Sequence, residues 1–95
     1  MSDLTLPIRA HVWVSGRVQG VGYRAAACNK AMALELNGWV RNLSDGRVEA
    51  VFEGAIAQVE EMLRWCHQGS SWAIVDAVTI EYEPLENLRQ FEVRQ

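Results

Sequence analysis

The feature that most constrains the fold is a glycine-rich segment between a stretch of alternating apolar residues and an alanine-rich stretch. It reads Gly16-Arg17-Val18-Gln19-Gly20-Val21-Gly22-Tyr23-Arg24. Glycine lets the main chain curl so that successive N–H groups point inward. The first N–H groups of a following helix have no intrahelical acceptor, and the helix dipole favours an anion beside them. The segment therefore predicts an anion site, where Arg24 offers a planar fork of donors that suits phosphate oxygens.

The spacing of these glycines matches neither the P-loop nor the dinucleotide-binding fingerprint. The whole string from Gly16 to Arg24 instead resembles the first signature of the acylphosphatase family. A second segment resembles the next signature of that family: Gly38-Trp39-Val40-Arg41-Asn42, continuing as Asp45-Gly46-Arg47-Val48-Glu49-Ala50. The resemblance extends from about Ile8 to Arg94.

This resemblance implies a complete chemistry. Members of the family hydrolyse the carboxyl–phosphate bond of small-molecule acyl phosphates to a carboxylate and inorganic phosphate. They use no metal, no cofactor and no covalent intermediate. Carried onto this chain, the catalytic residues are Arg24, which grips the phosphate, and Asn42, which places the attacking water. The residues that the resemblance assigns to substrate binding are Val18, Gln19, Gly20, Val21, Gly22 and Tyr23.

The residue types fit those roles on physical grounds. A phosphoryl group under attack spreads charge over its non-bridging oxygens, so catalysis is mostly positioning and electrostatic stabilisation. Main-chain donors need no reorganisation, and Arg24 adds a permanent charge. Asn42 is a poor base but can orient water, because its carbonyl accepts and its NH₂ donates hydrogen bonds.

Simpler interpretations stand beside these roles. Asn42 can be a turn residue leading into Asp45-Gly46, Gly16 can serve only strand-to-helix geometry, and Gln19 can brace the loop without contacting substrate. Two positions depart from the family pattern: Tyr23 stands where phenylalanine is commoner, and Ser70 stands where proline usually follows glycine. The missing proline predicts a more mobile loop at 69–73.

Hydrophobic periodicity predicts the secondary structure. Apolar residues alternate in strands and recur every three or four positions on one face of a helix. We expect Asn37-Gly38 to stop the first helix. The predicted strands are 8–15, 39–42, 47–53, 75–82 and a short one around 91–93, and the predicted helices are 22–36 and 55–68. This order predicts an α+β fold of the ferredoxin-like, split β-α-β class, a mainly antiparallel sheet with both helices on one face.

Composition narrows the class of protein. A chain of 95 residues that is 49% hydrophobic and 22% charged is typical of one globular domain, here residues 1–95. A net charge of −3 argues against binding to a nucleic-acid backbone or an anionic membrane. The absence of a signal peptide and of a long apolar run predicts a cytoplasmic protein, and we expect a monomer.

The cysteines and histidines give no metal-site pattern. Cys28 and Cys66 are too few and too far apart for a zinc site, so we expect two thiols in a reducing compartment. A disulfide between them stays open, since it requires close Cα atoms that a sequence does not show. We expect His11 and His67 to be structural or solvent-facing.

Two other functions compete with a free-standing enzyme. One is a phosphate-binding module of the same fold that has lost turnover or serves as a regulatory part of a larger assembly. The other is an RNA-binding module of the same fold, which needs stacking aromatics and usually a basic sheet. Glu49 and Glu53 on the third strand make the RNA interpretation the weaker one.

Overall fold

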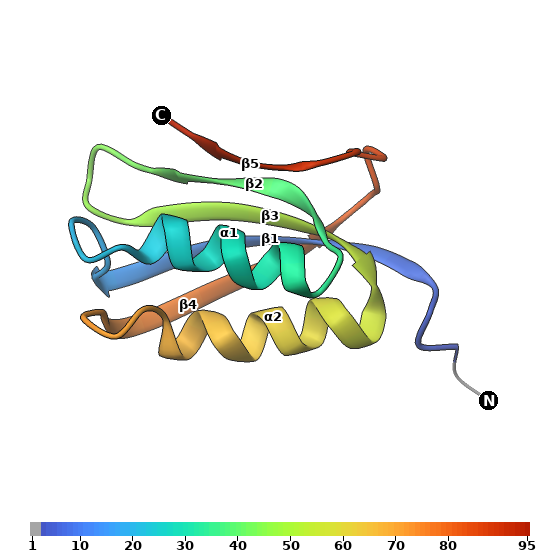
Figure 1. Ribbon diagram of the computed structural model, residues 1–95, viewed down its shortest axis with the longest axis horizontal. Coiled ribbons are helices and arrows are strands. Elements are labelled where there is room, and N and C mark those ends of the chain that lie inside the picture. Colours follow the sequence, from blue (N-terminus) through green and yellow to red (C-terminus); the bar gives the residue numbers. More distant parts are fainter. Residues whose placement is uncertain (1–2) are drawn as a thin grey trace.

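The computed structural model describes residues 3–95 as a five-stranded sheet with two helices packed on one face (Figure 1). The strands lie in the order β4-β1-β3-β2-β5, and all neighbours are antiparallel except the parallel pair β2 and β5. This arrangement confirms the predicted ferredoxin-like class. The elements are β1 (Pro7–Arg17), α1 (Tyr23–Ala33), β2 (Asn37–Asn42), β3 (Val48–Ala55), α2 (Ile56–Gln68), β4 (Ile74–Glu83) and β5 (Phe91–Arg94).

The core lies between the sheet and the helices. Alternation places Ala10, Val12 and Val14 of β1 on the helix side, each no more than 1% exposed. The register pairs Val12 with Ala50 and so continues the apolar face onto β3. Small residues on the inner face of α1, Ala27 and Ala31, are fully covered. The apolar stripe predicted for α2 is buried as expected at Val59, Met62, Leu63 and Cys66. Burial of Cys66 raises the pKa of its thiol to about 12, and both cysteines are free.

The end of α1 differs from the prediction. The helix stops at Ala33 instead of residue 36, and the left-handed residue is Glu35, with φ 59°. The chain must turn early because Leu36 is buried on the sheet, where its N–H donates to the Ala31 carbonyl at 2.9 Å. The predicted stop signal, Asn37-Gly38, instead opens β2. At Gly38 a Cβ atom would lie 1.8 Å from the Val51 carbonyl oxygen, so the approach of β2 to β3 requires glycine there.

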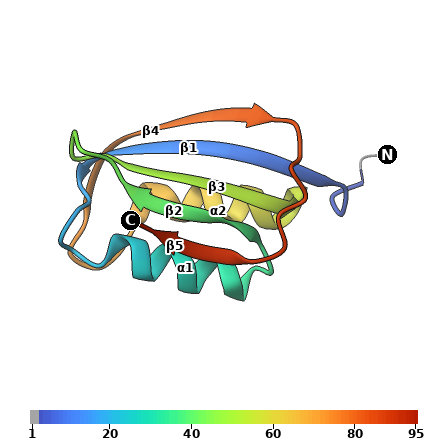
Figure 2. The ribbon, with the colours of Figure 1, turned by 90° about the horizontal axis from the view of Figure 1, so that it is seen from above.

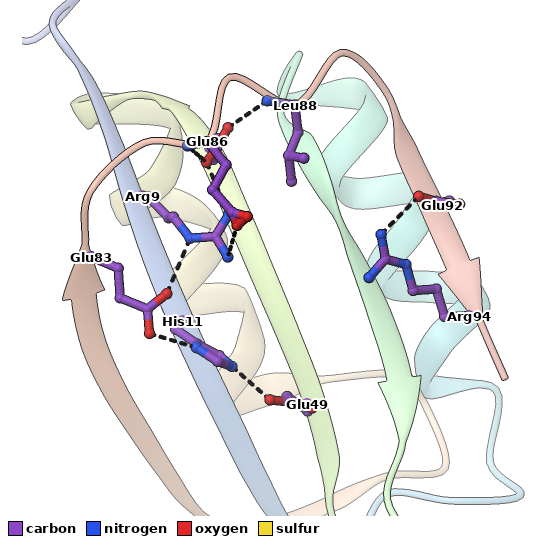
Figure 3. A network of polar contacts seen from close by, with 9 residues as sticks. Arg9, His11, Glu49, Glu83, Glu86, Leu88, Glu92 and Arg94 are labelled. Carbon is purple, nitrogen blue, oxygen red and sulfur yellow. Dashed lines mark hydrogen bonds and ion pairs between the residues drawn. The ribbon is translucent and has the colours of Figure 1, made fainter.

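The open face of the sheet carries a network of charged side chains (Figure 3). Arg9 is 6% exposed and contacts Glu53 at 3.0 Å and Glu83 at 3.1 Å. His11 lies between two carboxylates, at 2.6 Å from Glu49 and 2.7 Å from Glu83. These contacts join β1, β3 and β4 on the side away from the helices, and they give His11 the structural role expected for it.

The charges of this network hold the glutamates ionised. Desolvation opposes the charge on Glu49, but hydrogen bonds from His11 and Arg41 outweigh it and lower the pKa of that carboxyl. Desolvation likewise opposes the charge on Glu53, where the amides of Glu86 and Leu88, together with Arg9, lower its pKa.

Three loops meet at one end of the molecule. They are residues 18–22 before α1, residues 43–47 between β2 and β3, and residues 69–73 before β4 (Figures 1 and 2). The short strand β5 runs alongside β2 and ends at the same side (Figure 2). This end therefore gathers both sequence signatures. No helix within residues 3–95 is long and apolar enough to cross a membrane.

Candidate active site

The loop before α1 presents its main-chain amides without partners. Gly20 and Gly22 have φ angles of 74° and 78°, in the left-handed region that favours glycine. Gly22 is the N-cap of α1, and the first helical bond runs from the Ala26 N–H to the Gly22 carbonyl. Within residues 3–95, none of the amides from Val18 to Ala25 donates a hydrogen bond to the protein. An anion can accept hydrogen bonds from this row of free N–H groups.

A pocket of about 240 Å³ opens over this loop. Its volume is below the roughly 300–1,000 Å³ of sites for drug-sized ligands, so it suits a phosphate and a small attached group. The residues that line it are Val18, Gly20, Gly22, Tyr23, Arg24, Ala25, Asn42 and Val93. The two expected catalytic residues thus lie on one pocket with four of the six expected binding residues.

Arg24 is the second residue of α1, and β5 holds the guanidinium at the end of its side chain. Its Nη1 donates to the Arg94 carbonyl at 3.0 Å. The Arg94 guanidinium lies 4.9 Å from the centre of the Trp39 ring. It also pairs with Glu92 at 3.1 Å (Figure 3). In the described part of the chain this carbonyl is the one hydrogen-bond partner of Arg24, so its other donors are available to a ligand.

Asn42 is the last residue of β2, opposite Val48 of β3. Its Oδ1 is buried and, among residues 3–95, is the one buried side-chain polar atom without a hydrogen-bond partner. Buried polar groups are nearly always paired in folded proteins, and exceptions often mark functional sites. The strand ladder, rather than a turn, holds Asn42, because the turn into β3 is made by residues 43–47.

The side chain of Gln19 holds the loop and does not line the pocket. Its Nε2 donates to the carbonyls of Leu43 and Arg47, at 2.8 and 2.9 Å. The side chain therefore ties the loop before α1 to the β2–β3 connection, which is the bracing role considered as the simpler interpretation. Gln19 and Val21 are the two expected binding residues that do not line the pocket.

Tyr23 contributes to the pocket wall, but its hydroxyl points into the protein. The ring is 2% exposed, and its OH donates to the Cys66 carbonyl near the end of α2 at 2.8 Å. Burial raises the pKa of this phenol well above its usual value. Gly16 serves strand geometry, since a Cβ there would lie 2.2 Å from the Ile74 carbonyl oxygen.

The sequence did not reveal three residues near the site. Ala25 and Val93 line the pocket, and Ser70 contacts the loop through a hydrogen bond from its Oγ to the Val21 carbonyl at 2.8 Å. Val93 reaches the site because β5 pairs in parallel with β2, with Val93 opposite Val40. Ser70 and Val21 are far apart in the sequence, so no local pattern indicates their contact.

The described residues support neither a metal site nor a catalytic base at Asp45. No group of three or more His, Cys, Asp or Glu residues that could hold a metal ion occurs within residues 3–95. Asp45 is exposed, and its carboxylate accepts from the Arg47 N–H at 3.1 Å, as a turn residue does.

A family model, curated relatives and solved structures each include matches to acylphosphatases. A model of the acylphosphatase family matches residues 10–93. An acylphosphatase of Trichormus variabilis is 61% identical over 88 residues, which are 93% of this chain and 87% of the relative. Among solved structures, an acylphosphatase from Coxiella burnetii superposes with a TM-score of 0.90 at 40% identity and covers 93% of both chains. The acylphosphatase from Bacillus subtilis gives a TM-score of 0.91 at 31% identity, over 93% of this chain and 99% of that one. The chain therefore belongs to the acylphosphatase family, whose members hydrolyse the carboxyl–phosphate bond of acyl phosphates.

Proposed function

We propose that the pocket over the loop before α1 is the active site, and that it binds the phosphoryl group of an acyl phosphate. The observation that carries this proposal is that Arg24 and Asn42 line one pocket together with Val18, Gly20, Gly22, Tyr23 and Ala25, whose amides have no partner within residues 3–95.

The loop amides and Arg24 hold the phosphate oxygens. Charge builds on these oxygens as the carboxyl–phosphate bond breaks, and donors already aimed at them stabilise the transition state without reorganising. The hydrogen bond from Arg24 to the Arg94 carbonyl limits the motion of the guanidinium. Fixed geometry of this kind is the main source of rate in phosphoryl transfer.

Asn42 orients the attacking water. Its carboxamide can accept from the water and donate to it, and its buried Oδ1, which has no partner within residues 3–95, becomes paired when the water enters with the substrate. The water oxygen forms a bond to phosphorus as the carboxylate leaves with the electron pair of the broken bond. The water's proton passes to a phosphate oxygen of the substrate, so no protein base is required.

The acyl group of the bound substrate extends out of the pocket past Ala25 and Val93. Val93 is 46% exposed and lies at the edge of the site, so it offers an apolar wall to the first carbons of the acyl group. The carboxylate is a good leaving group and needs no general acid. The small pocket volume implies recognition of the phosphate and of its nearest atoms, and not of a long acyl chain.

The test is hydrolysis of benzoyl phosphate in the presence of EDTA, measured for the unaltered protein, for Arg24→Ala and for Arg89→Ala. Arg89 is exposed and carries the same side chain, so it serves as the matched control. We expect unchanged activity with EDTA and with Arg89→Ala, and loss of both turnover and phosphate inhibition with Arg24→Ala. Turnover that survives in Arg24→Ala contradicts the assigned site, and turnover that disappears with EDTA contradicts the metal-free mechanism.

We also propose that the protein acts as a single-domain, cytoplasmic monomer that does not bind nucleic acid. The net charge of −3 supports the last point, because an acidic protein is repelled by a phosphate backbone. Light scattering measures the mass of the particle, and a gel-shift assay at moderate salt tests RNA binding. A dimeric mass or a shifted RNA band contradicts the corresponding part.

A further inference from the structure

The loop before α1 is held by a side chain from outside both sequence signatures. Ser70 lies in the connection between α2 and β4, and its Oγ donates to the Val21 carbonyl at 2.8 Å. The connection is a tight turn, since the Ala73 N–H donates to the Ser70 carbonyl at 3.0 Å. The hydroxyl is therefore presented from a folded turn.

This hydrogen bond fixes the direction of the Gly22 amide. The bond between Val21 and Gly22 is a trans peptide, because residues 3–95 contain no cis peptide. In a planar trans peptide the C=O and the following N–H point in opposite directions. When Ser70 holds the Val21 carbonyl on one side, the Gly22 N–H must point to the other, and Gly22 lines the pocket.

Within residues 3–95, no other hydrogen bond is made by the C=O or the N–H of that peptide. The first bond of α1 joins the Ala26 N–H to the Gly22 carbonyl, so the Val21 carbonyl has no main-chain donor within residues 3–95. Val21 lies between Gly20 and Gly22, both in the left-handed region, and glycine also accepts other conformations readily. The Ser70 hydroxyl therefore selects one orientation of a peptide that its sequence leaves free to rotate.

A second contact anchors the residue after Gly22. The Tyr23 hydroxyl donates to the Cys66 carbonyl, and the Tyr23 ring lies 5.3 Å from the Trp65 ring. The end of α2 and the turn after it thus hold the loop at two points, at the Val21 carbonyl and at the Tyr23 side chain.

We propose that Ser70 is a positioning residue for the acylphosphatase reaction: through the Val21 carbonyl it aims the Gly22 N–H at the phosphoryl group. This inference rests on the proposed function, because it assumes that the loop amides bind phosphate. Ser70 itself does not touch the substrate. Its effect is on how well one donor of the phosphate site is oriented.

The experiment compares Ser70→Ala, Ser70→Thr and Ser71→Ala with the unaltered protein. Ser70→Thr keeps the hydroxyl, and Ser71 is the exposed neighbour in the same turn, so Ser71→Ala removes a hydroxyl with no contact to the loop. Three quantities are measured for each: kcat/KM with benzoyl phosphate, the inhibition constant of inorganic phosphate, and the shift of the Gly22 amide proton resonance during a phosphate titration.

We expect Ser70→Ala to lower kcat/KM by about 3- to 10-fold, which corresponds to the loss of one neutral hydrogen bond. Phosphate inhibition should weaken by a similar factor, and the phosphate-induced shift of the Gly22 amide should shrink. Ser70→Thr should restore all three quantities, and Ser71→Ala should leave them unchanged. Thermal unfolding of each variant separates these effects from a general loss of stability.

The outcomes distinguish this inference from the function on which it rests. If phosphate moves no loop amide in the unaltered protein, the phosphate site itself is wrong. If it moves the Gly22 amide equally in the unaltered protein and in Ser70→Ala, only the role of Ser70 is wrong. A lower melting temperature in Ser70→Ala with unchanged kinetics also overturns the proposal, since it assigns Ser70 to stability alone.

Discussion

Replacement of Asn42 by alanine should lower turnover and raise the stability of the fold. The carboxamide is proposed to orient water only at the transition state, so its removal should lower kcat by about 10²- to 10³-fold, the usual effect of deleting one preorganised polar group. Phosphate binding depends on Arg24 and the loop amides, so the inhibition constant of phosphate should change little.

The stability effect follows from the buried Oδ1 of Asn42. This atom has no hydrogen-bond partner within residues 3–95, and a buried polar group left unpaired destabilises a fold by about 1–3 kcal/mol. Alanine removes that group and retains a short apolar side chain at the end of β2. We therefore expect the free energy of unfolding to rise by about 1 kcal/mol, and the melting temperature by about 4–8 °C for a domain of this size.

The assay pairs steady-state hydrolysis of benzoyl phosphate with calorimetric unfolding. Asn29→Ala is the control for activity, because Asn29 is exposed on α1 and the chemical change is the same. It should keep full turnover. If Asn42→Ala turns over as fast as the unaltered protein, or is less stable by 1 kcal/mol or more, the carboxamide is a structural group and the reasoning is refuted.

Three further predictions concern the supports of the site and of the sheet. Glu53→Gln should destabilise the fold by about 3 kcal/mol in urea titrations, because it breaks a buried ion pair with Arg9; a change below 1 kcal/mol contradicts this view of the network. The lowered pKa values of Glu49, Glu53 and Glu83 make their stabilisation complete above about pH 4.3, the ordinary glutamate pKa. It should be lost as the pH falls through the lower folded-state values, so the unfolding free energy should decline as the pH falls below about 4.3; a flat profile argues against these contacts. Gln19→Ala should lower kcat/KM by about 10-fold, because it removes both hydrogen bonds between the loop and the β2–β3 connection. If the variant and the unaltered protein have equal kinetics, Gln19 does not brace the loop.

Much of the fold follows from local patterns in the sequence. Period-two alternation in β1 and the apolar stripe of α2 correctly predicted which side chains face the core, because burial of one face dominates the energetics of each element. The predicted end of α1 was wrong. Asn37-Gly38 has the usual residues of a helix stop, but burial of Leu36 makes the chain reverse at Glu35, and Gly38 is needed instead for contact between strands.

The candidate site was predictable only where it is local in the sequence. The loop glycines and Arg24 are neighbours, so one motif places them together at the start of α1. Asn42 came from a second motif, and the ladder between β2 and β3 sets its position. Val93 and Ser70 belong to no motif, because a parallel strand pair and a turn after α2 bring them to the pocket through tertiary packing. The catalytic roles of Arg24 and Asn42 stay predictions until kinetics test them.

The most direct test of the central claim is the structure of the protein in complex with inorganic phosphate, a product of the reaction. We expect phosphate oxygens at about 3 Å from the amide nitrogens of Gly20, Gly22 and Tyr23 and from the guanidinium of Arg24, with Asn42 at the edge of the bound anion. A phosphate bound instead on the open sheet face, beside Arg41 and Arg94, with the loop amides unoccupied, would contradict it.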